Sequence, residues 1–457
     1  MKRLLPVLLG LALAGCGDLD DARRVQDPES RRDGERTVPA ESLGLGSGTR
    51  LTMAQGLQIA LRNNPTIAID RALVEHSQAV LEEVTAGYYP QIAFSSDYRW
   101  QKSGGAGNGD QPGSKIGPNS GIIQTHGGSV TLSQMIYDFG RTDAARRQAY
   151  AQYTAAQSDL ASAENDVVFN FRQDFFNVLK QEELVSVGEE TVRQFEKHLE
   201  QVKGFVEVGT RQKYDLTKAQ VDLGNAQLTL VKARTALTVA KATLNNVLGL
   251  ASDPLYTLEH PGAAGPWGMS FTDAVEAARA YHPALQSLIL RENAARAEID
   301  AAIANFYPNL TLAGDYSWAG SLTPVTWSSF LGPVLSWVLT SGGALTGTLH
   351  GAVADLRQAY ASRALEEQSI FLDLRNGYAS LEDTRESLRI LSLTVQSATE
   401  TLDLVTGRYK VGKASAVELT DAEVQLATAK AQEIQARYDY EISIAAIERS
   451  IGGARKP

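Results

Sequence analysis

Two stretches decide the fold: YYPQIAFSSDYRW at residues 88–100 and FYPNLTLAGDYSW at residues 306–318. In both, a Tyr-Pro pair precedes a run in which large apolar residues alternate with small or polar ones. A period of two predicts a β-strand with one apolar face. The apolar positions are Ile92, Phe94, Tyr98 and Trp100 in the first run and Leu310, Leu312, Tyr316 and Trp318 in the second.

The resemblance between the two stretches extends into an internal duplication. Residues 52–100 align with residues 270–318 without a gap, at an offset of 218. Further along, the offset becomes 203, and Val208-Gly209 falls on Val411-Gly412. We therefore expect one structural unit twice, at residues 49–250 and 269–457, joined by a connector at residues 251–268 that contains Pro and Gly.

Long helices are expected after the strands, because apolar residues recur there every seven positions. No proline lies between Pro118 and Pro254 or between Pro333 and Pro457, so nothing interrupts a helix in either tract. A helix from about residue 142 to 206 would be roughly 100 Å long, and it would form a hairpin with the helix after Gly209. We assign these apolar positions to a coiled-coil core. The first series is Phe171, Val178, Val185, Val192, Leu199 and Val206, and its counterpart is Leu374, Leu381, Leu388, Val395, Leu402 and Tyr409.

Returning strands are expected at about residues 129–137 and 330–339, with an exposed loop at residues 103–121. Strands of about ten residues with one apolar face are typical of transmembrane β-barrels, although a soluble sheet gives the same alternation. Four strands cannot close a barrel, but three chains with four strands each can form a closed barrel of twelve. We expect a mixed, mainly α fold, in which the helices of three chains form a hollow cylinder.

The N-terminus resembles a bacterial lipoprotein signal. Lys2 and Arg3 precede the apolar run at residues 4–14, and Cys16, the only cysteine, follows Gly15. We expect a signal peptide at residues 1–15, lipid attachment at Cys16 and a polar tether at residues 16–48. The alternative is an ordinary secretory signal with an incidental cysteine.

The composition argues against several classes of function. A net charge of −10 disfavours nucleic acid as a partner. The six histidines are scattered and are expected in isolated surface or capping roles. We find no arrangement typical of a catalytic, metal or cofactor site, so we expect neither an enzyme nor a cofactor.

The order helix, strand, strand, long helix, turn, helix, repeated once, resembles the TolC family of outer-membrane efflux proteins. The resemblance covers nearly all of the mature chain. The lipidated start resembles the NodT and CusC branch of that family. Its specific pieces are Tyr89-Pro90 and Tyr307-Pro308, the strand-to-helix segment at residues 137–141, the turns around Gly209 and Gly412, and Ile451-Gly452-Gly453.

This resemblance implies a homotrimeric duct in the outer membrane of a Gram-negative bacterium, with lipid around its β-barrel and an α-helical barrel across the periplasm. Its tips would meet a periplasmic adaptor (membrane fusion protein), coupled to an inner-membrane pump, which we expect to be of the RND type. The chain would be the exit duct of a tripartite system that exports small molecules. A type I protein secretion duct remains the alternative within the family. A lipid-tethered periplasmic coiled-coil scaffold without a pore is the alternative outside it.

The resemblance also names site residues. Glu418 and Asp421 lie three positions apart after the second turn, as do the acids that line the periplasmic aperture in the family, and Asp215 holds the equivalent place after the first turn. The same acids could equally serve a helix N-terminus without any pore. Gly209 and Gly412 supply tight turns at the tips. The candidate adaptor contacts are the tip residues Gly209, Thr210, Arg211, Gly412 and Lys413.

One departure from the family pattern is visible at the second strand-to-helix corner. There Thr340-Ser341-Gly342-Gly343 replaces Tyr137-Asp138-Phe139-Gly140. We therefore expect the second corner to bend differently from the first.

Overall fold

The computed structural model describes residues 48–102, 122–209, 212–250, 252–262, 265–320 and 325–453. The predicted signal peptide, Cys16, nearly all of the tether, the loop at residues 103–121, and the tip residues Thr210 and Arg211 lie outside the described residues. The helices are α4 (Met53–Asn63), α5 (Pro65–Thr85), η2 (a 3-10 helix, Ala86–Tyr88), α6 (Arg141–Glu207), α7 (Lys213–Val247), α8 (Phe271–Tyr281), α9 (Pro283–Ala304), α10 (Ala344–Lys410) and α11 (Ala416–Ile451). The strands are β1 (Thr49–Leu51), β2 (Gln91–Lys102), β3 (Ile122–Tyr137), β4 (Tyr256–Leu258), β5 (Asn309–Gly320) and β6 (Thr326–Ser336).

The element bounds confirm the internal duplication. Helices α4 and α8 begin and end 218 positions apart, and strands β2 and β5 do the same. Helices α6 and α10, each of 67 residues, begin and end 203 positions apart. Both offsets seen in the sequence are therefore properties of the fold. The domain boundaries at residues 250 and 268 remain predictions.

The chain divides into two compact units, and each contains segments of both repeats. One unit holds residues 48–69, 163–280 and 370–453, and the other holds residues 70–162 and 281–369 of the described chain. We describe each unit by itself.

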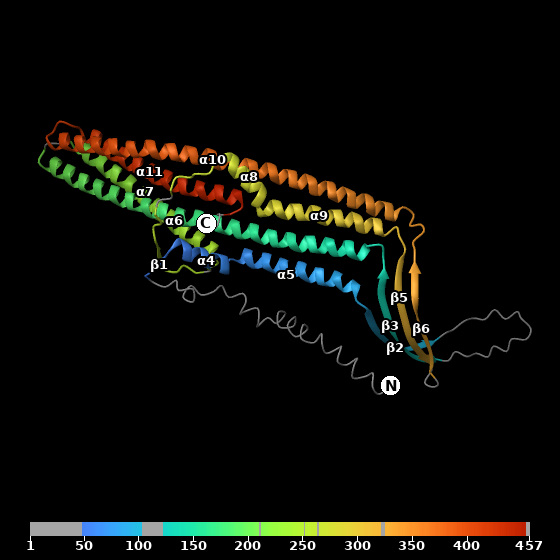
Figure 1. Cartoon of the computed structure of the whole chain (residues 1–457). Helices are drawn as coiled ribbons and strands as arrows, with labels where there is room; N and C mark the ends of the chain where they lie inside the picture. The colour runs from blue at the N-terminus through green and yellow to red at the C-terminus, as the bar shows by residue number, and fades with distance from the viewer. Residues whose placement is uncertain are drawn as a thin grey trace, which may run out of the picture. The chain divides into compact units, whose positions relative to one another are not determined.

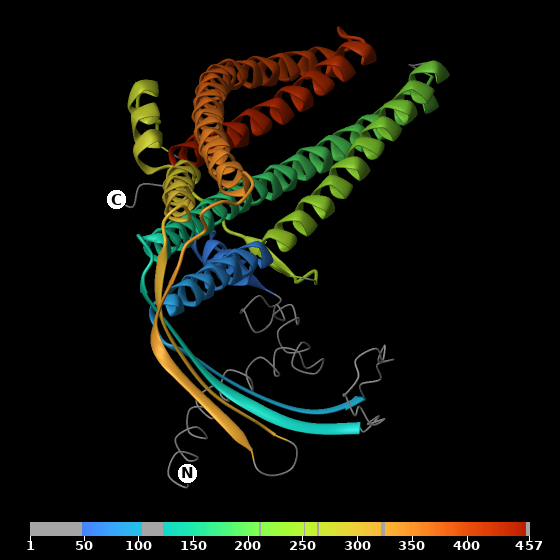
Figure 2. The ribbon, with the colours of Figure 1, turned by 90° about the vertical axis from the view of Figure 1, so that its right-hand side faces the viewer.

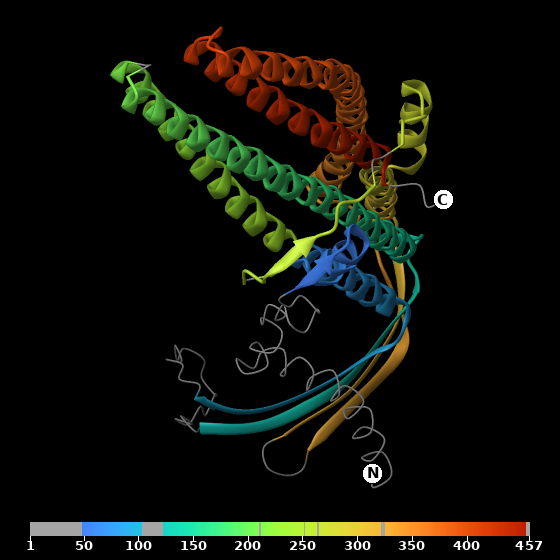
Figure 3. The same ribbon diagram turned by 90° about the vertical axis from the view of Figure 1, so that its left-hand side faces the viewer.

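The second unit contains an antiparallel sheet in the order β2-β3-β5-β6, whose strands curve together along their length (Figures 1, 2 and 3). Both returning strands are present, but β3 begins before the expected residue 129 and β6 ends at Ser336. The large side chains that alternate along β2 are exposed, with 66% of Phe94 and 71% of Trp100 open to solvent. In the described part of the chain, β2 and β6 each pair on one side only.

The two corners where a strand enters a long helix have the same left-handed φ angles at equivalent positions, so the expectation of a different second corner is wrong for these two residues. Phe139 and Gly140 have φ angles of 55° and 88°, and Gly342 and Gly343 have φ angles of 60° and 94°. The first corner reaches the left-handed region with a non-glycine residue. The ring of Phe139 packs against Tyr137 and Tyr307, at centroid distances of 4.8 and 5.1 Å, and these contacts offset the strain. Two glycines adopt the same angles without such packing.

The first unit contains two helical hairpins, α6 with α7 and α10 with α11. The predicted heptad positions face inward: Phe171 and Leu374 are fully buried, and Val192 packs against Leu230. Near the tips the two hairpins touch, because the ring of Tyr409 on α10 lies 5.7 Å from that of His198 and 6.4 Å from that of Phe205, both on α6.

The connector carries a strand that the sequence analysis did not predict. Strand β4, within residues 251–268, pairs in parallel with β1, with Leu51 opposite Leu258. Nearby, the side-chain amide of Asn63 donates to the carbonyl oxygens of Leu248 and Gly249 at 2.9 and 3.0 Å. These bonds fix the end of α4 against the end of α7.

Among the described residues, no helix combines the length and the apolar content needed to cross a membrane.

Candidate functional site

The turn between α10 and α11 is a closed, hydrogen-bonded tip. Gly412 has a φ of 74° and donates its N–H to the carbonyl of Tyr409 at 3.0 Å. Lys413 donates its N–H to the carbonyl of Arg408 at 2.8 Å, and the Arg408 guanidinium donates to the carbonyl of Lys413 at 3.1 Å. These bonds satisfy the last carbonyls of α10 in the manner of a Schellman motif, so the turn needs a left-handed residue at Gly412.

The corresponding turn between α6 and α7 has the same requirement. Gly209 has a φ of 76° and donates its N–H to the carbonyl of Val206 at 3.0 Å. A Cβ added at Gly209 or at Gly412 would meet no atom within 4 Å, so the backbone angle alone favours glycine there. The expected role of both glycines as tight-turn residues is confirmed. The next two tip residues, Thr210 and Arg211, are not described.

Glu418 caps the start of α11. The Ser415 hydroxyl accepts the N–H of Glu418 at 3.1 Å, and the Glu418 carboxylate accepts the N–H of Ser415 at 3.2 Å, which completes a capping box. The hydrogen bond from the Ser415 backbone, together with that from its hydroxyl, lowers the pKa of Glu418, and the positive charge of Arg408 acts in the same direction. The Arg408 guanidinium lies 3.7 Å from the carboxylate. Glu418 is therefore ionised and structurally engaged, as the helix-start alternative requires.

Asp421 and Asp215 are placed differently. Asp421 is exposed on α11, one turn after Glu418. Asp215 lies in the first turn of α7, on the other hairpin. Within one chain, the Glu418 carboxylate forms an ion pair with the Arg408 guanidinium of the same hairpin. We did not predict Arg408 as a site residue, although its position in the last turn of α10, beside the tip glycine, was a usable signal.

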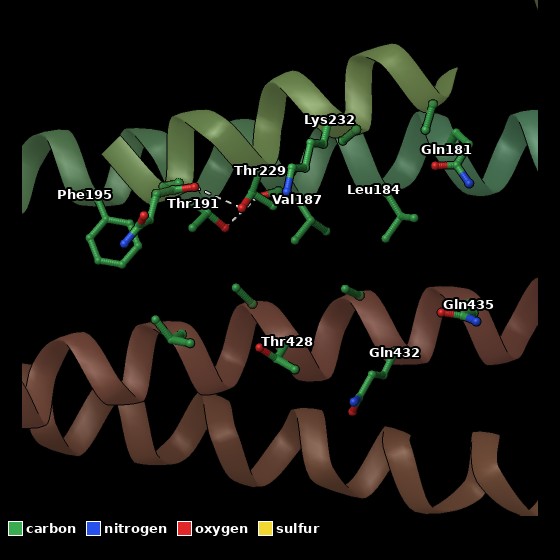
Figure 4. Close-up of a pocket in the computed structure, with 18 of the residues that line it drawn as sticks. Gln181, Leu184, Val187, Thr191, Phe195, Thr229, Lys232, Thr428, Gln432 and Gln435 are labelled. Carbon is green, nitrogen blue, oxygen red and sulfur yellow. Dashed lines mark hydrogen bonds between the residues drawn. The ribbon is translucent and has the colours of Figure 1, made fainter. Parts of the chain in front are cut away.

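A cavity of about 770 Å³ lies between α6, α7 and α11 in the first unit. Side chains of α6 and α7, such as Val187, Thr191 and Lys232, face Thr428 and Gln432 of α11 across it (Figure 4). Most of its lining is apolar or uncharged.

Two buried titratable side chains lie in the same unit. His198 of α6 is 3% exposed and Glu423 of α11 is 8% exposed. The expectation of a surface or capping role is therefore wrong for His198. The sequence did contain a signal for Glu423, because it lies four residues after Leu419 and three before Leu426, and residues at these spacings share one face of a helix. The described residues contain no group of three or more His, Cys, Asp or Glu side chains suited to hold a metal ion.

Comparisons with known proteins identify the class. The family described as "Outer membrane efflux protein" matches residues 56–250 and 274–453. The chain is 22% identical to the outer membrane protein TolC of Escherichia coli over 470 residues, covering 99% of this chain and 87% of TolC. It is also 22% identical to the toluene efflux pump outer membrane protein TtgC of Pseudomonas putida over 465 residues, covering 96% and 93%. Among solved structures it matches CusC with a TM-score of 0.76 at 18% identity, covering 90% of this chain and 94% of CusC.

The repeated strand and hairpin architecture is therefore that of a TolC-like channel. The chain belongs to the outer membrane efflux protein family. Its place is the outer membrane, where it serves as an exit duct for efflux.

Proposed function

We propose that this outer-membrane efflux protein is a channel without enzymatic activity, and that it is the homotrimeric exit duct of a tripartite system that exports small molecules. The observation that supports the trimer most directly is the sheet of the second unit. Its edge strands β2 and β6 each have one side free of pairing in the described chain, and its large apolar side chains are exposed. In lipid, backbone groups at a sheet edge must find partners, and a closed barrel provides them. Three copies of four strands supply twelve.

Small molecules as cargo are supported by a relative. TtgC is named a toluene efflux pump outer membrane protein and is similar over nearly its whole length. We therefore prefer small-molecule efflux over type I protein secretion, and an RND pump with its periplasmic adaptor as partners. A periplasmic scaffold without a pore does not explain why the strands carry exposed aromatic side chains. Lipid attachment at Cys16 belongs to the same proposal.

We place the periplasmic aperture at Glu418, Asp421 and Asp215. In a trimer, each of these acids would recur three times around one axis, and a ring of carboxylates favours cations over anions. The capping role of Glu418 complicates any test, because its removal changes both the charge and the helix start.

The chain offers variants that separate the two roles. Glu418→Gln keeps the capping geometry and removes the charge, because glutamine also serves in a capping box. Ser415→Ala removes the cap and keeps the charge. We expect Glu418→Gln with Asp421→Asn to raise the conductance of the purified protein in planar bilayers and to bring its cation-to-anion permeability ratio toward one, while Ser415→Ala leaves that ratio unchanged. An unchanged ratio in the charge-removing variant would place the aperture elsewhere.

Docking of the adaptor at the tips has its own test. Cysteines at Lys413 and at the neighbouring tip positions should cross-link to a co-expressed adaptor, whereas a cysteine at the exposed helical residue Glu400 should not. A scan of both tips without any cross-link would contradict tip docking.

A further inference from the structure

Helices α6 and α11 are joined by a series of ion pairs in antiparallel register. As the residue number rises along α6, the partner's number falls along α11. The Arg449 guanidinium lies 2.6 Å from the Asp166 carboxylate, and the Lys430 ammonium lies 3.0 Å from that of Glu190. The full series is Asp166–Arg449, Arg172–Glu448, Lys180–Asp439, Glu183–Arg437 and Glu190–Lys430.

The next position of this register, toward the tips, is occupied by His198 and Glu423. His198 lies eight residues beyond Glu190, and Glu423 lies seven residues before Lys430. Here the pattern changes. Both side chains are buried, and among the described residues neither the His198 Nδ1 nor the Glu423 Oε2 has a hydrogen-bond partner. A register that places opposite charges together five times thus ends in two buried polar groups that are not joined.

The neighbouring charges do not compensate these two groups. On α7, the negative charge of Asp222 acts on both His198 and Glu423, but its carboxylate is already paired with the Lys218 ammonium at 3.0 Å. The positive charge of Lys218 opposes that of Asp222 at His198, because it lowers the pKa of the imidazole. Asp215, also on α7, acts on His198. On α10, the ring of Tyr409 lies 5.7 Å from the His198 ring. The remaining charges nearest along the register, Glu190 and Lys430, are paired with each other.

Burial moves both groups toward their uncharged forms. It raises the pKa of Glu423 to about 7, with the negative charge of Asp222 acting in the same direction. It lowers the pKa of His198 below its ordinary value. Near neutral pH, the two side chains can therefore both be uncharged, which is the state that a buried, unpaired position tolerates.

We propose that His198 and Glu423 form a pH-dependent latch that holds the α6–α7 hairpin against the α10–α11 hairpin while both side chains are uncharged. Ionisation of Glu423 or protonation of His198 places an uncompensated charge in the contact and releases it. When the hairpins part, water reaches each charged group and the cost of burying its charge disappears.

The two groups give the latch opposite pH responses. In a parted, hydrated state, Glu423 has its ordinary pKa of 4.5, so the packed state loses stability as pH rises from about 4.5 to about 7 and changes little above that. His198 titrates near 6.5 when hydrated, so the packed state loses stability as pH falls below about 6.5. A variant that lacks one of the two groups should therefore show the pH dependence that the other group gives to the packed state.

The test follows the separation of the hairpins directly. Lys203 of α6 and Gln425 of α11 are exposed, so cysteines there can carry spin labels, and a Cys16→Ala background removes the only native thiol. In the full chain in detergent, pulsed EPR measures the fraction of parted hairpins. Between about pH 5.5 and about pH 7, we expect this equilibrium constant to rise roughly tenfold in His198→Gln and to fall in Glu423→Gln. The double variant should show no pH dependence.

The matched control is Glu433→Gln, which removes the next acid of α11 and should keep the wild-type profile. The latch would be overturned if His198→Gln and Glu423→Gln both kept the wild-type pH dependence of hairpin separation. It would also be overturned if the distance between the labels did not change with pH in any variant. If the chain is a duct, release of the latch widens its periplasmic end. This consequence rests on the proposed function, which bilayer conductance tests separately. A pH-responsive hairpin distance in a protein that forms no channel would refute only the duct, and a channel with a pH-independent distance would refute only the latch.

Discussion

At the scale of the residue, the tip glycines act through backbone angle alone. Gly412 has a positive φ and open space around it, so Gly412→Ala should destabilise the tip by about 1 kcal/mol through strain and not through a clash. Gly407, in the last turns of α10, also has open space but is helical. Gly407→Ala should therefore stabilise the same hairpin, by about 0.5–1 kcal/mol. Hydrogen exchange over residues 405–420 measures both changes, and equal effects of the two substitutions would contradict the argument.

A second residue-scale prediction concerns Asp174, which lies on α6 beside the buried Phe171 and Phe175. Burial raises the pKa of Asp174 from its ordinary value of 3.8 to about 6. An acid with a raised folded-state pKa lowers stability as pH rises between these two values, and the loss is complete above about pH 6. Because solvent still reaches this carboxylate, we expect Asp174→Asn to stabilise the protein by about 1–2 kcal/mol at about pH 8 and to have little effect at about pH 4.

Thermal unfolding at the two pH values checks this prediction. Asp403→Asn, at an exposed position of α10, is the control and should change stability at neither pH. A stabilisation by Asp174→Asn that is equal at both pH values would mean that packing, and not charge, is responsible.

At the scale of the element, the two long helices start from equivalent caps of different strength. The Asp138 carboxylate accepts the N–H groups of Thr142 and Gly140 at 2.8 and 3.2 Å. At the equivalent corner, the Ser341 hydroxyl accepts the N–H of Leu345 at 3.2 Å. Loss of a cap costs about 0.5–2 kcal/mol, so Asp138→Ala should lie at the upper end of that range and Ser341→Ala at the lower end.

Hydrogen exchange separates the two effects, because the first turns of α6 and α10 lie in different peptides. Asp138→Ala should speed exchange at the start of α6 only, and Ser341→Ala should speed it at the start of α10 only. A larger effect of the serine substitution would contradict the assigned difference in cap strength.

Also at the element scale, the sequence predicted what repeats and missed what depends on contacts between distant segments. The helix expected at about residues 142–206 is Arg141–Glu207, because heptads extend over nine turns and more and few alternatives compete with them. Strand β4 has three residues and a partner about 200 positions away, so it has no measurable period. The left-handed φ of Phe139 depends on ring packing against Tyr307, which no local pattern contains.

The candidate site was predictable to a similar extent. The turn glycines follow from local geometry, whereas the pairing of Arg408 with Glu418 and the burial of His198 depend on how helices face each other. A seven-residue period identifies the buried face of a helix. It does not identify which residues of a second hairpin lie opposite.

At the scale of the whole molecule, the edges of the sheet decide the assembly. Strand β2 pairs with β3, and β6 pairs with β5, so each edge offers a row of N–H and C=O groups to a partner. If β2 of one copy pairs with β6 of the next, a ring that closes after three copies leaves no edge unpaired. An open association would instead continue without limit, so the largest cross-linked species distinguishes the two.

Cysteines placed in pairs along the two edges test this closure. One member of each pair lies on β2 at residues 93–97 and the other on β6 at residues 328–332. Oxidation in outer-membrane vesicles should yield monomer, dimer and trimer on a denaturing gel and nothing larger, because the third bond closes the ring. Pairs that join β6 to the inner strand β3, such as Thr131→Cys with Leu331→Cys, should give no cross-linked oligomer, since β3 already has a strand on each side. A ladder that extends beyond the trimer would mean that the sheet edges associate without closing, and the twelve-strand barrel would be wrong.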